Sequence, residues 1–294
     1  MLKKQFLEYY KSERNCSELT IVSYKKDLEE FEAFYQSLNE DITWTTAGED
    51  IIREWVINLL DEQKMSAASV NRKLSTLRSF YHYLVKLKKV STNPMSRIVG
   101  PKKKKVLPTF VREQEMDNLI EILNQDKTYE GQLQKTIILT LYLTGIRRAE
   151  LLSLQDKDID FIQKQIKVTG KRDKQRIIPF GPELEETIKA YLEERTRQFE
   201  QGFEQLFISP KGKPITASHV EKIVKDNLTK VTTIKKRSPH VLRHTFATAM
   251  LNNNADLATI QKLLGHTNLN TTQVYTHVSF EELKNEYKNA HPRS

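Results

Sequence analysis

A segment rich in proline and lysine divides this chain into two parts, and it limits the fold more than any other feature. Between residues 93 and 108, residues that break helices and strands stand beside an unbroken run of positive charge. The breakers are Pro94, Gly100, Pro101 and Pro108, and the run is Lys102, Lys103, Lys104 and Lys105. Proline and charge repulsion keep such a segment extended. It is either a solvated linker or a linker that lies along a nucleic-acid duplex.

The length of 294 residues suffices for two domains of ordinary size on either side of this segment. We therefore predict a first domain over residues 1–98, a basic linker over residues 99–108 and a second domain over residues 109–294.

The first domain is predicted to consist of helices only, because apolar residues recur in it with helical spacing. The four apolar stripes cover residues 2–10, 21–35, 51–60 and 70–84. Thr20 is the predicted N-cap of the second helix. The fourth helix, over residues 66–89, carries basic residues on its other faces: Arg72, Lys73 and Arg78. They are either ordinary surface charges or part of a clamp that lays this helix in a DNA groove.

The second domain is predicted to be helical with a small antiparallel sheet, so the fold class is mainly α. Strands are expected at residues 159–161, 165–169 and 175–180, and helices at 111–124, 133–144, 183–197, 218–229, 240–253, 257–264, 271–275 and 280–288. Gly145 ends the second of these helices and places Arg147 at a bend. The turn between the last two strands carries Lys171 and Arg172, which are either solvated or able to reach into a groove or an active site.

The composition favours a polyanionic partner and an intracellular location. The chain has 47 Lys and Arg against 38 Asp and Glu, which gives a net charge of +9. Its single cysteine, Cys16, excludes an internal disulfide and fits a reducing cytoplasm. No apolar run approaches the roughly 18 residues of a membrane span. We therefore expect a soluble, cytoplasmic protein with no membrane partner.

The C-terminal part holds a tyrosine, Tyr275, downstream of arginines and histidines. Arginine and lysine stabilise charge on a phosphate, histidine transfers protons, and a phenol can become a covalent nucleophile. This combination predicts phosphoryl transfer through a phosphotyrosine. His240 and His244 have the spacing of a helical zinc pair, but no glutamate follows the first histidine, so no metal is expected. There is also no glycine-rich phosphate loop, and no cofactor is expected.

Five motifs in order identify the chain as similar to a tyrosine recombinase of the phage-integrase superfamily, most similar to the Xer type. They are Thr144–Leu151, the Gly170-Lys171 hairpin followed by Arg176-Ile177-Ile178-Pro179, His240–His244, Leu264–His266 and Thr271–His277. The resemblance covers nearly the whole length. It implies a SAM-like core-binding domain followed by a tyrosine-recombinase catalytic domain.

The resemblance also implies the roles of individual residues. Tyr275 would attack the scissile phosphate, Arg147 and Arg243 would grip its non-bridging oxygens, and Lys171 would protonate the departing 5′-oxygen. His240 would accept or share the proton of the tyrosine, and His266 would hydrogen-bond the phosphate. Glu150 would orient the first arginine. The predicted DNA contacts are Arg72, Lys73, Arg78, Lys102, Lys103, Lys104, Lys105 and Arg172.

The implied function is site-specific recombination of double-stranded DNA through a 3′-phosphotyrosyl intermediate and a Holliday junction, as in Xer-like chromosome-dimer resolution. Four protomers would assemble on DNA, with or without a paralogous recombinase. The alternatives are an integrase of a mobile element, a type IB topoisomerase-like activity and a non-catalytic DNA-binding protein. The helix over residues 280–288 would dock either on its own domain or on a neighbouring protomer.

Overall fold

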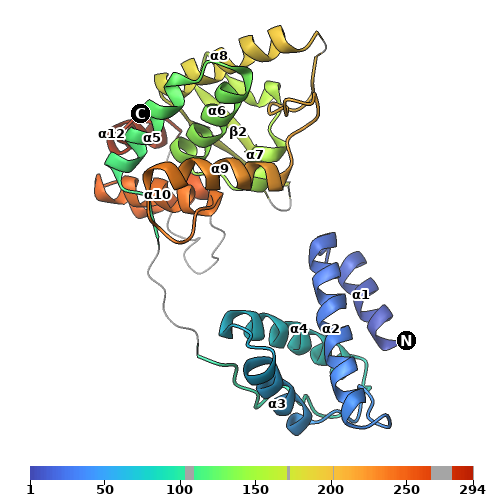
Figure 1. Ribbon diagram of the computed structural model, residues 1–294. Coiled ribbons are helices and arrows are strands. Elements are labelled where there is room, and N and C mark those ends of the chain that lie inside the picture. Colours follow the sequence, from blue (N-terminus) through green and yellow to red (C-terminus); the bar gives the residue numbers. More distant parts are fainter. Residues whose placement is uncertain (103–108, 171–172, 201, 266–279, 294) are drawn as a thin grey trace. The chain divides into compact units, whose positions relative to one another are not determined.

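The computed structural model divides the chain into two compact units, Met1–Val106 and Leu107–Ser294. It describes residues 1–102, 109–170, 173–200, 202–265 and 280–293, without the side chains of residues 280–282 and 284. The fold is mainly α-helical with a three-stranded antiparallel sheet, so the predicted fold class is confirmed (Figure 1). The division falls inside the predicted linker, whose limits stay a prediction. The helix predicted over residues 271–275 lies outside the described residues.

Residues 1–102 of the first unit form four α-helices and one π-helical turn. They are α1 (Leu2–Ser12), α2 (Glu18–Leu38), α3 (Glu49–Ile57), the π-turn η1 (Asn58–Glu62) and α4 (Ala67–Lys86). Their apolar faces meet in a core rich in aromatic rings, where Phe31 packs against Trp55 and Trp44 packs against Phe80. Large aromatic side chains bury much apolar area, which lets so small a unit hold a core of its own.

The N-cap of α2 differs from the prediction. Ser17 caps this helix, because its hydroxyl accepts a hydrogen bond from the backbone N–H of Thr20 at 3.3 Å. The prediction of Thr20 as the cap was wrong, since Thr20 is the third residue inside the helix. Both residues are good capping types, and only the backbone conformation decides between them.

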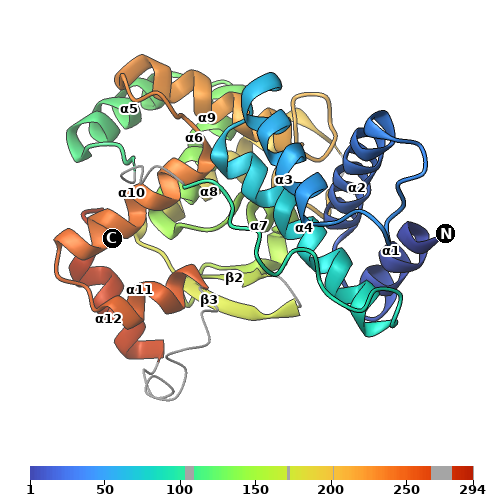
Figure 2. The ribbon, with the colours of Figure 1, turned by 90° about the horizontal axis from the view of Figure 1, so that it is seen from below.

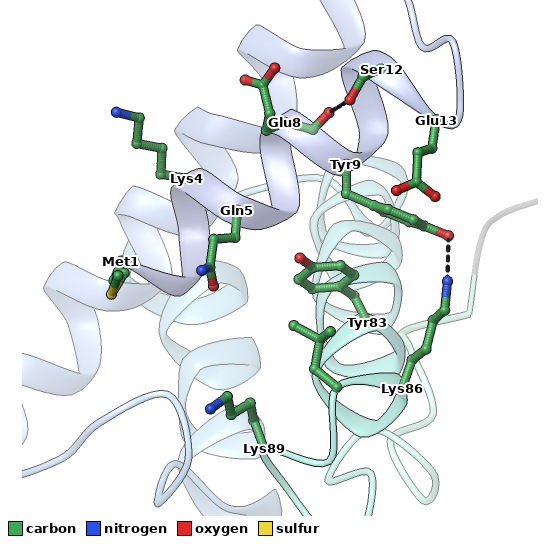
Figure 3. Close-up of a pocket in the computed structure, with 11 residues that line it drawn as sticks. Met1, Lys4, Gln5, Glu8, Tyr9, Ser12, Glu13, Tyr83, Lys86 and Lys89 are labelled. Carbon is green, nitrogen blue, oxygen red and sulfur yellow. Dashed lines mark hydrogen bonds between the residues drawn. The ribbon is translucent and has the colours of Figure 1, made fainter.

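A surface groove of about 870 Å³ runs between α1 and the end of α4 in the first unit (Figure 3). The ring of Tyr9 lies 5.0 Å from that of Tyr83, and the ammonium of Lys86 lies 4.8 Å above the Tyr9 ring. The groove contains none of the predicted catalytic residues.

The second unit holds the three strands β1 (Ile159–Asp160), β2 (Gln165–Thr169) and β3 (Gln175–Pro179), which pair in the order β1-β2-β3. Its helices are α5 (Glu113–Gln125), α6 (Tyr129–Thr144), α7 (Arg148–Ser153), the 3-10 turn η2 (Asp156–Asp158), α8 (Pro182–Gln198), α9 (Ala217–Val231), α10 (Pro239–Asn252), α11 (Leu257–Leu264) and α12 (Phe280–Ala290). The predicted strands are confirmed, with the first and last each one residue shorter.

Helix α6 is the centre of the second unit, and nearly all of its residues are buried. It contacts α5, α8, α9 and α10, which surround it in Figure 1. From Thr136 to Thr144 every residue of the helix is buried, which is typical of a helix in an interior position. It ends at Gly145, whose φ of +60° is left-handed, so the chain turns there and begins α7. The bend therefore directly follows the buried centre of the unit.

Helix α12 docks on its own unit, against α10 and β3 (Figure 2). The buried Tyr287 donates a hydrogen bond to the carbonyl oxygen of Leu143 at 3.0 Å. His291 stacks on the ring of Tyr287, and Arg293 forms ion pairs with Glu183. Of the two predicted placements of this helix, the structure contains the one on its own domain. In the described part of the chain, no helix is long and apolar enough to cross a membrane.

Candidate active site

A pocket of about 390 Å³ brings together three of the six predicted catalytic residues, Arg147, His240 and Arg243. One wall is the bend between α6 and α7, and the other is the first turn of α10. The two walls come from parts of the chain about a hundred residues apart, so the pocket exists only in the folded protein. Arg148 also lines it and forms an ion pair with Glu221.

Arg147 is held at the bend by Glu150. The backbone N–H of Arg147 donates to Glu150 Oε2, and its Nη1 donates to Glu150 Oε1, both at 2.8 Å. A further hydrogen bond runs from Arg147 Nη2 to the carbonyl oxygen of Gly265 at 2.8 Å. The side chain is nevertheless 42% exposed, so part of the guanidinium faces the pocket. Because the guanidinium is charged and partly exposed, it can bind an anion in the pocket.

Arg243 sits deeper, with only 5% of the residue exposed. Its Nη1 donates to the carbonyl oxygen of Gly145 and its Nη2 to that of Leu264, both at 2.6 Å. Burial and the nearby charge of Arg147 lower the pKa of Arg243 to about 10. The guanidinium therefore remains charged at neutral pH, and it lines the pocket together with those of Arg147 and Arg148.

Glu150 balances part of this charge. It is 3% exposed and accepts hydrogen bonds from Arg147 and, in a bidentate pair, from Arg176 at 2.9 and 2.8 Å. Burial opposes its ionisation, but the hydrogen bonds from Arg176 and from the Arg147 backbone outweigh burial and lower its pKa to about 2. The carboxylate is thus ionised throughout the physiological range. This geometry fits the expected role of Glu150 in orienting Arg147.

His240 lies in the first turn of α10 and lines the pocket. Its ring centroid lies 4.5 Å from that of His244, and partial burial together with His244 lowers the pKa of His240 below its ordinary value. His240 is therefore neutral at neutral pH and can accept a proton. Within the described ranges, no three His, Cys, Asp or Glu side chains are grouped closely enough to hold a metal ion.

Comparison with known proteins identifies the family of the chain. Residues 109–282 match the phage integrase family, and residues 4–88 match the N-terminal SAM-like domain of phage integrases. The chain belongs to the phage integrase family. It is a tyrosine-type site-specific recombinase, and it is of the Xer type.

Individual relatives agree with this assignment. The tyrosine recombinase XerC of Staphylococcus epidermidis is 41% identical over 293 residues, which cover 100% of this chain and 98% of the relative. The crystal structure of XerA recombinase has 29% identity and a TM-score of 0.51 over 100% of this chain and 99% of that one. XerH site-specific recombinase, bound to its difH substrate in a pre-cleavage complex, has 25% identity and a TM-score of 0.70, over 96% and 83% of the two chains.

The other predicted catalytic residues of this recombinase, Lys171, His266 and Tyr275, lie outside the described residues. Their chain neighbours are nevertheless placed. Gly170 closes the β2–β3 hairpin by donating from its N–H to the carbonyl oxygen of Lys174 at 2.8 Å. Gly265, directly before His266, accepts a hydrogen bond from Arg147.

The predicted DNA contacts fall into three groups. Lys103, Lys104, Lys105 and Arg172 lie outside the described residues, and Lys102 is exposed. Arg72 is exposed and Arg78 is half-buried, and both also bond within the first unit, Arg72 to Asp27 and Arg78 to the carbonyl oxygen of Ile98.

Lys73 requires a correction. It is 2% exposed and forms ion pairs with Asp27, at 3.3 Å, and with Glu30. The prediction that Lys73 projects from the surface toward DNA was wrong. Asp27 is itself fully buried, and a buried carboxylate needs a cationic partner. Lys73 fills that need by joining α4 to α2.

Sequence reasoning missed Arg176 as a residue of this site. The only signal was its place in the hairpin motif, at the start of a strand whose later residues are apolar. The sequence does not reveal that its guanidinium pairs with Glu150, which lies 26 residues earlier.

Proposed function

We propose that this recombinase cuts and rejoins double-stranded DNA at a specific site through a 3′-phosphotyrosyl intermediate and a Holliday junction. The observation that carries the proposal is the pocket in which the guanidiniums of Arg147 and Arg243 lie beside His240. A tetrahedral phosphate has two non-bridging oxygens, and two guanidiniums that remain charged suit them as paired donors. Their positions are fixed before DNA binds, so little reorganisation is required in the transition state.

In the proposed cleavage step, the phenolic oxygen of Tyr275 forms a bond to the scissile phosphorus. The bond between phosphorus and the 5′-oxygen breaks, and Lys171 gives a proton to that departing oxygen. His240 accepts or shares the proton of the tyrosine, which suits a neutral imidazole with a lowered pKa. His266 hydrogen-bonds the phosphate. The phosphotyrosine conserves the energy of the broken bond, so rejoining needs no cofactor.

The proposed biological role is the resolution of chromosome dimers by four protomers on two duplexes. The similarity to the XerC relative over 98% of its length supports this role over mobile-element integration. Loss of the gene should then raise the fraction of cells with unseparated chromosomes, with no element lost or gained. A paralogous recombinase would be a partner if purified protein alone leaves Holliday junctions unresolved.

The chemistry is tested with a suicide substrate, a duplex nicked beside the cleavage position so that the cut end diffuses away. The wild-type protein should form an adduct that survives a denaturing gel, and Tyr275→Phe should bind the same DNA yet form none. An adduct in the phenylalanine variant would remove Tyr275 as the nucleophile. Relaxation of supercoiled DNA of any sequence, without joining of two sites, would instead identify a topoisomerase-like enzyme.

A further inference from the structure

The end of α11 offers three successive backbone carbonyl oxygens to three different arginines. Arg176 Nε donates to the carbonyl oxygen of Leu263 at 2.7 Å, and Arg243 Nη2 donates to that of Leu264 at 2.6 Å. Arg147 Nη2 donates to the carbonyl oxygen of Gly265 at 2.8 Å. Two of these arginines line the proposed phosphate pocket, and the third, Arg176, does not.

The chemistry of a helix end explains why the arginines gather there. The last carbonyls of an α-helix have no N–H partner within the helix, and they carry the negative end of its dipole. Gly265, with a φ of +64°, closes α11 by donating from its own N–H back to Gln261 and Lys262. The carbonyls of residues 263–265 then need other donors, and each guanidinium supplies one. The backbone thus fixes the spacing of the arginines.

Arg176 is also joined to Arg147 through a shared carboxylate. Glu150 accepts from Arg176 through both of its oxygens and from Arg147 through both as well. Arg176 is 14% exposed in its side chain and packs under Gly265, where an added Cβ would lie 3.2 Å from its guanidinium. It therefore connects β3, α7 and the end of α11 at a single point.

We propose that Arg176 is a positioning residue for Arg147 and Arg243, which together form the phosphate clamp, and that the end of α11 is the template that aligns these two arginines. This inference rests on the proposed function. Arg176 acts through two partners. It pairs with Glu150, so that this carboxylate holds Arg147 without fully neutralising its charge. It also bonds the carbonyl oxygen of Leu263, which is next to the carbonyl that accepts from Arg243. Both effects set where the guanidiniums point before DNA binds.

Removal of Arg176 should therefore affect the cleavage step more than DNA binding. Glu150 would pair with Arg147 alone, in competition with the phosphate, and the carbonyl of Leu263 would lose its donor. In metal sites, removing an outer partner that orients a ligand typically costs about 10- to 100-fold in activity, and Arg176 stands in the same relation to Arg147. We expect a loss of this size in the single-turnover cleavage rate of Arg176→Gln at saturating DNA, with a dissociation constant within about threefold of wild type, because contacts to the DNA backbone elsewhere dominate affinity.

The matched control is Arg195→Gln. Arg195 in α8 also forms a bidentate pair with a carboxylate, Asp156, and also donates to a backbone carbonyl, that of Leu206 at 2.8 Å. It is similarly buried and lies in the same unit, but it contacts neither Glu150 nor α11. Its loss should lower the melting temperature and leave the cleavage rate of the folded protein unchanged.

The experiment measures adduct formation on the suicide substrate, DNA affinity and melting for the full-length variants, with wild type and Tyr275→Phe alongside. A double variant with Glu150→Gln should lose less than the product of the two single losses, because Arg176 acts partly through Glu150. If Arg176→Gln does not fold, Arg176→Lys serves instead: it keeps the charge, loses the bidentate fork and should still slow cleavage about fivefold or more.

An Arg176 variant that cleaves at the rate of Arg195→Gln, or fully independent losses in the double variant, would overturn the inference. If the wild-type protein still forms the adduct in that case, only the proposed positioning role of Arg176 is wrong. A wild-type protein that forms no adduct overturns the proposed function and the inference together.

Discussion

Arg243 donates a hydrogen bond to the carbonyl oxygen of Gly145, only two residues before Arg147, at 2.6 Å. The guanidiniums of Arg147 and Arg243 are thus linked through the backbone of a single bend, although Arg243 lies in α10 and Arg147 lies just before α7. A shift of α10 would pull on the bend, and a shift of the bend would move both guanidiniums. The positions of Arg147 and Arg243 are therefore coupled, and a substitution of either arginine should affect cleavage.

Arg147→Ala and Arg243→Ala should each slow cleavage about 100-fold or more, as expected when a donor to a developing charge is lost. They should differ in stability. Arg147 is half exposed, whereas loss of Arg243 leaves two buried carbonyls without this donor, at about 1–3 kcal/mol for each group left unsatisfied. Suicide-substrate cleavage and urea unfolding measure the two effects. A variant that lost DNA binding and kept its cleavage rate would show that the arginine only holds the DNA and does not stabilise the transition state.

Gly145→Ala should damage both the fold and the site. An added Cβ would lie 2.5 Å from the ring of Phe246 and 2.8 Å from Leu264, in a backbone conformation that costs a non-glycine residue about 1–2 kcal/mol by itself. Crowding of the core adds about 1–3 kcal/mol. The control is Gly48→Ala, where a Cβ meets nothing within 4 Å. Equal unfolding midpoints for the two variants would contradict the prediction.

Local patterns predicted the elements well, because capping and periodicity are properties of neighbouring residues. Helix α11 was predicted with the bounds that it has, since its apolar spacing ends at a glycine. Contacts between segments far apart in the chain were harder to predict from the sequence. Lys73 looked like any surface lysine, and only the fold reveals that the buried Asp27 faces it. Arg176 was missed for the same reason, because its pairing with Glu150 depends on how the sheet packs against α7, which contacts β2.

Substitution of Lys73 should destabilise the first unit and leave the salt dependence of DNA binding unchanged. Removing one partner from a buried ion pair typically costs about 3–5 kcal/mol, and Arg72 remains beside Asp27 to reduce this loss. Lys102→Ala is the comparison, because Lys102 is exposed. If the linker lies along DNA, this variant should keep its stability and lower the slope of binding against salt by about 1. The reverse pattern in the two variants would restore Lys73 as a DNA contact.

Cleavage and strand exchange should persist in EDTA. The proposed mechanism stabilises the charge on the phosphate with Arg147, Arg243 and Lys171, which is the task that a metal ion performs in other phosphoryl-transfer enzymes. The measurement is adduct formation after dialysis against chelator. Activity that is abolished by EDTA and restored by zinc or magnesium would instead assign His240 and His244 to a metal site.

The docking of α12 should weaken in mild acid because of His291. This residue is 3% exposed, lies against the rings of Tyr142, Phe246 and Tyr287, and has a pKa that burial lowers to about 4. In the unfolded chain the pKa of histidine is about 6.5. Since the folded state binds the proton less readily, the contribution of neutral His291 to stability is full above pH 6.5 and is lost as the pH falls toward 4. The difference amounts to about 2 kcal/mol at pH 5 relative to pH 7.5.

Calorimetry of the full chain at pH 7.5, 6 and 5 tests this effect. The transition of the second unit should move to lower temperature with acid in the wild type and move much less in His291→Phe, whose ring can keep the stacking but cannot be protonated. His240→Gln is the control, because partial burial and His244 also lower the pKa of His240, which lies in the catalytic pocket and not under α12. The His240→Gln variant should retain most of the acid-induced decrease in the transition temperature. If His291→Phe kept the full pH dependence and His240→Gln lost it, the sensitive group would lie in the catalytic pocket and not under the C-terminal helix.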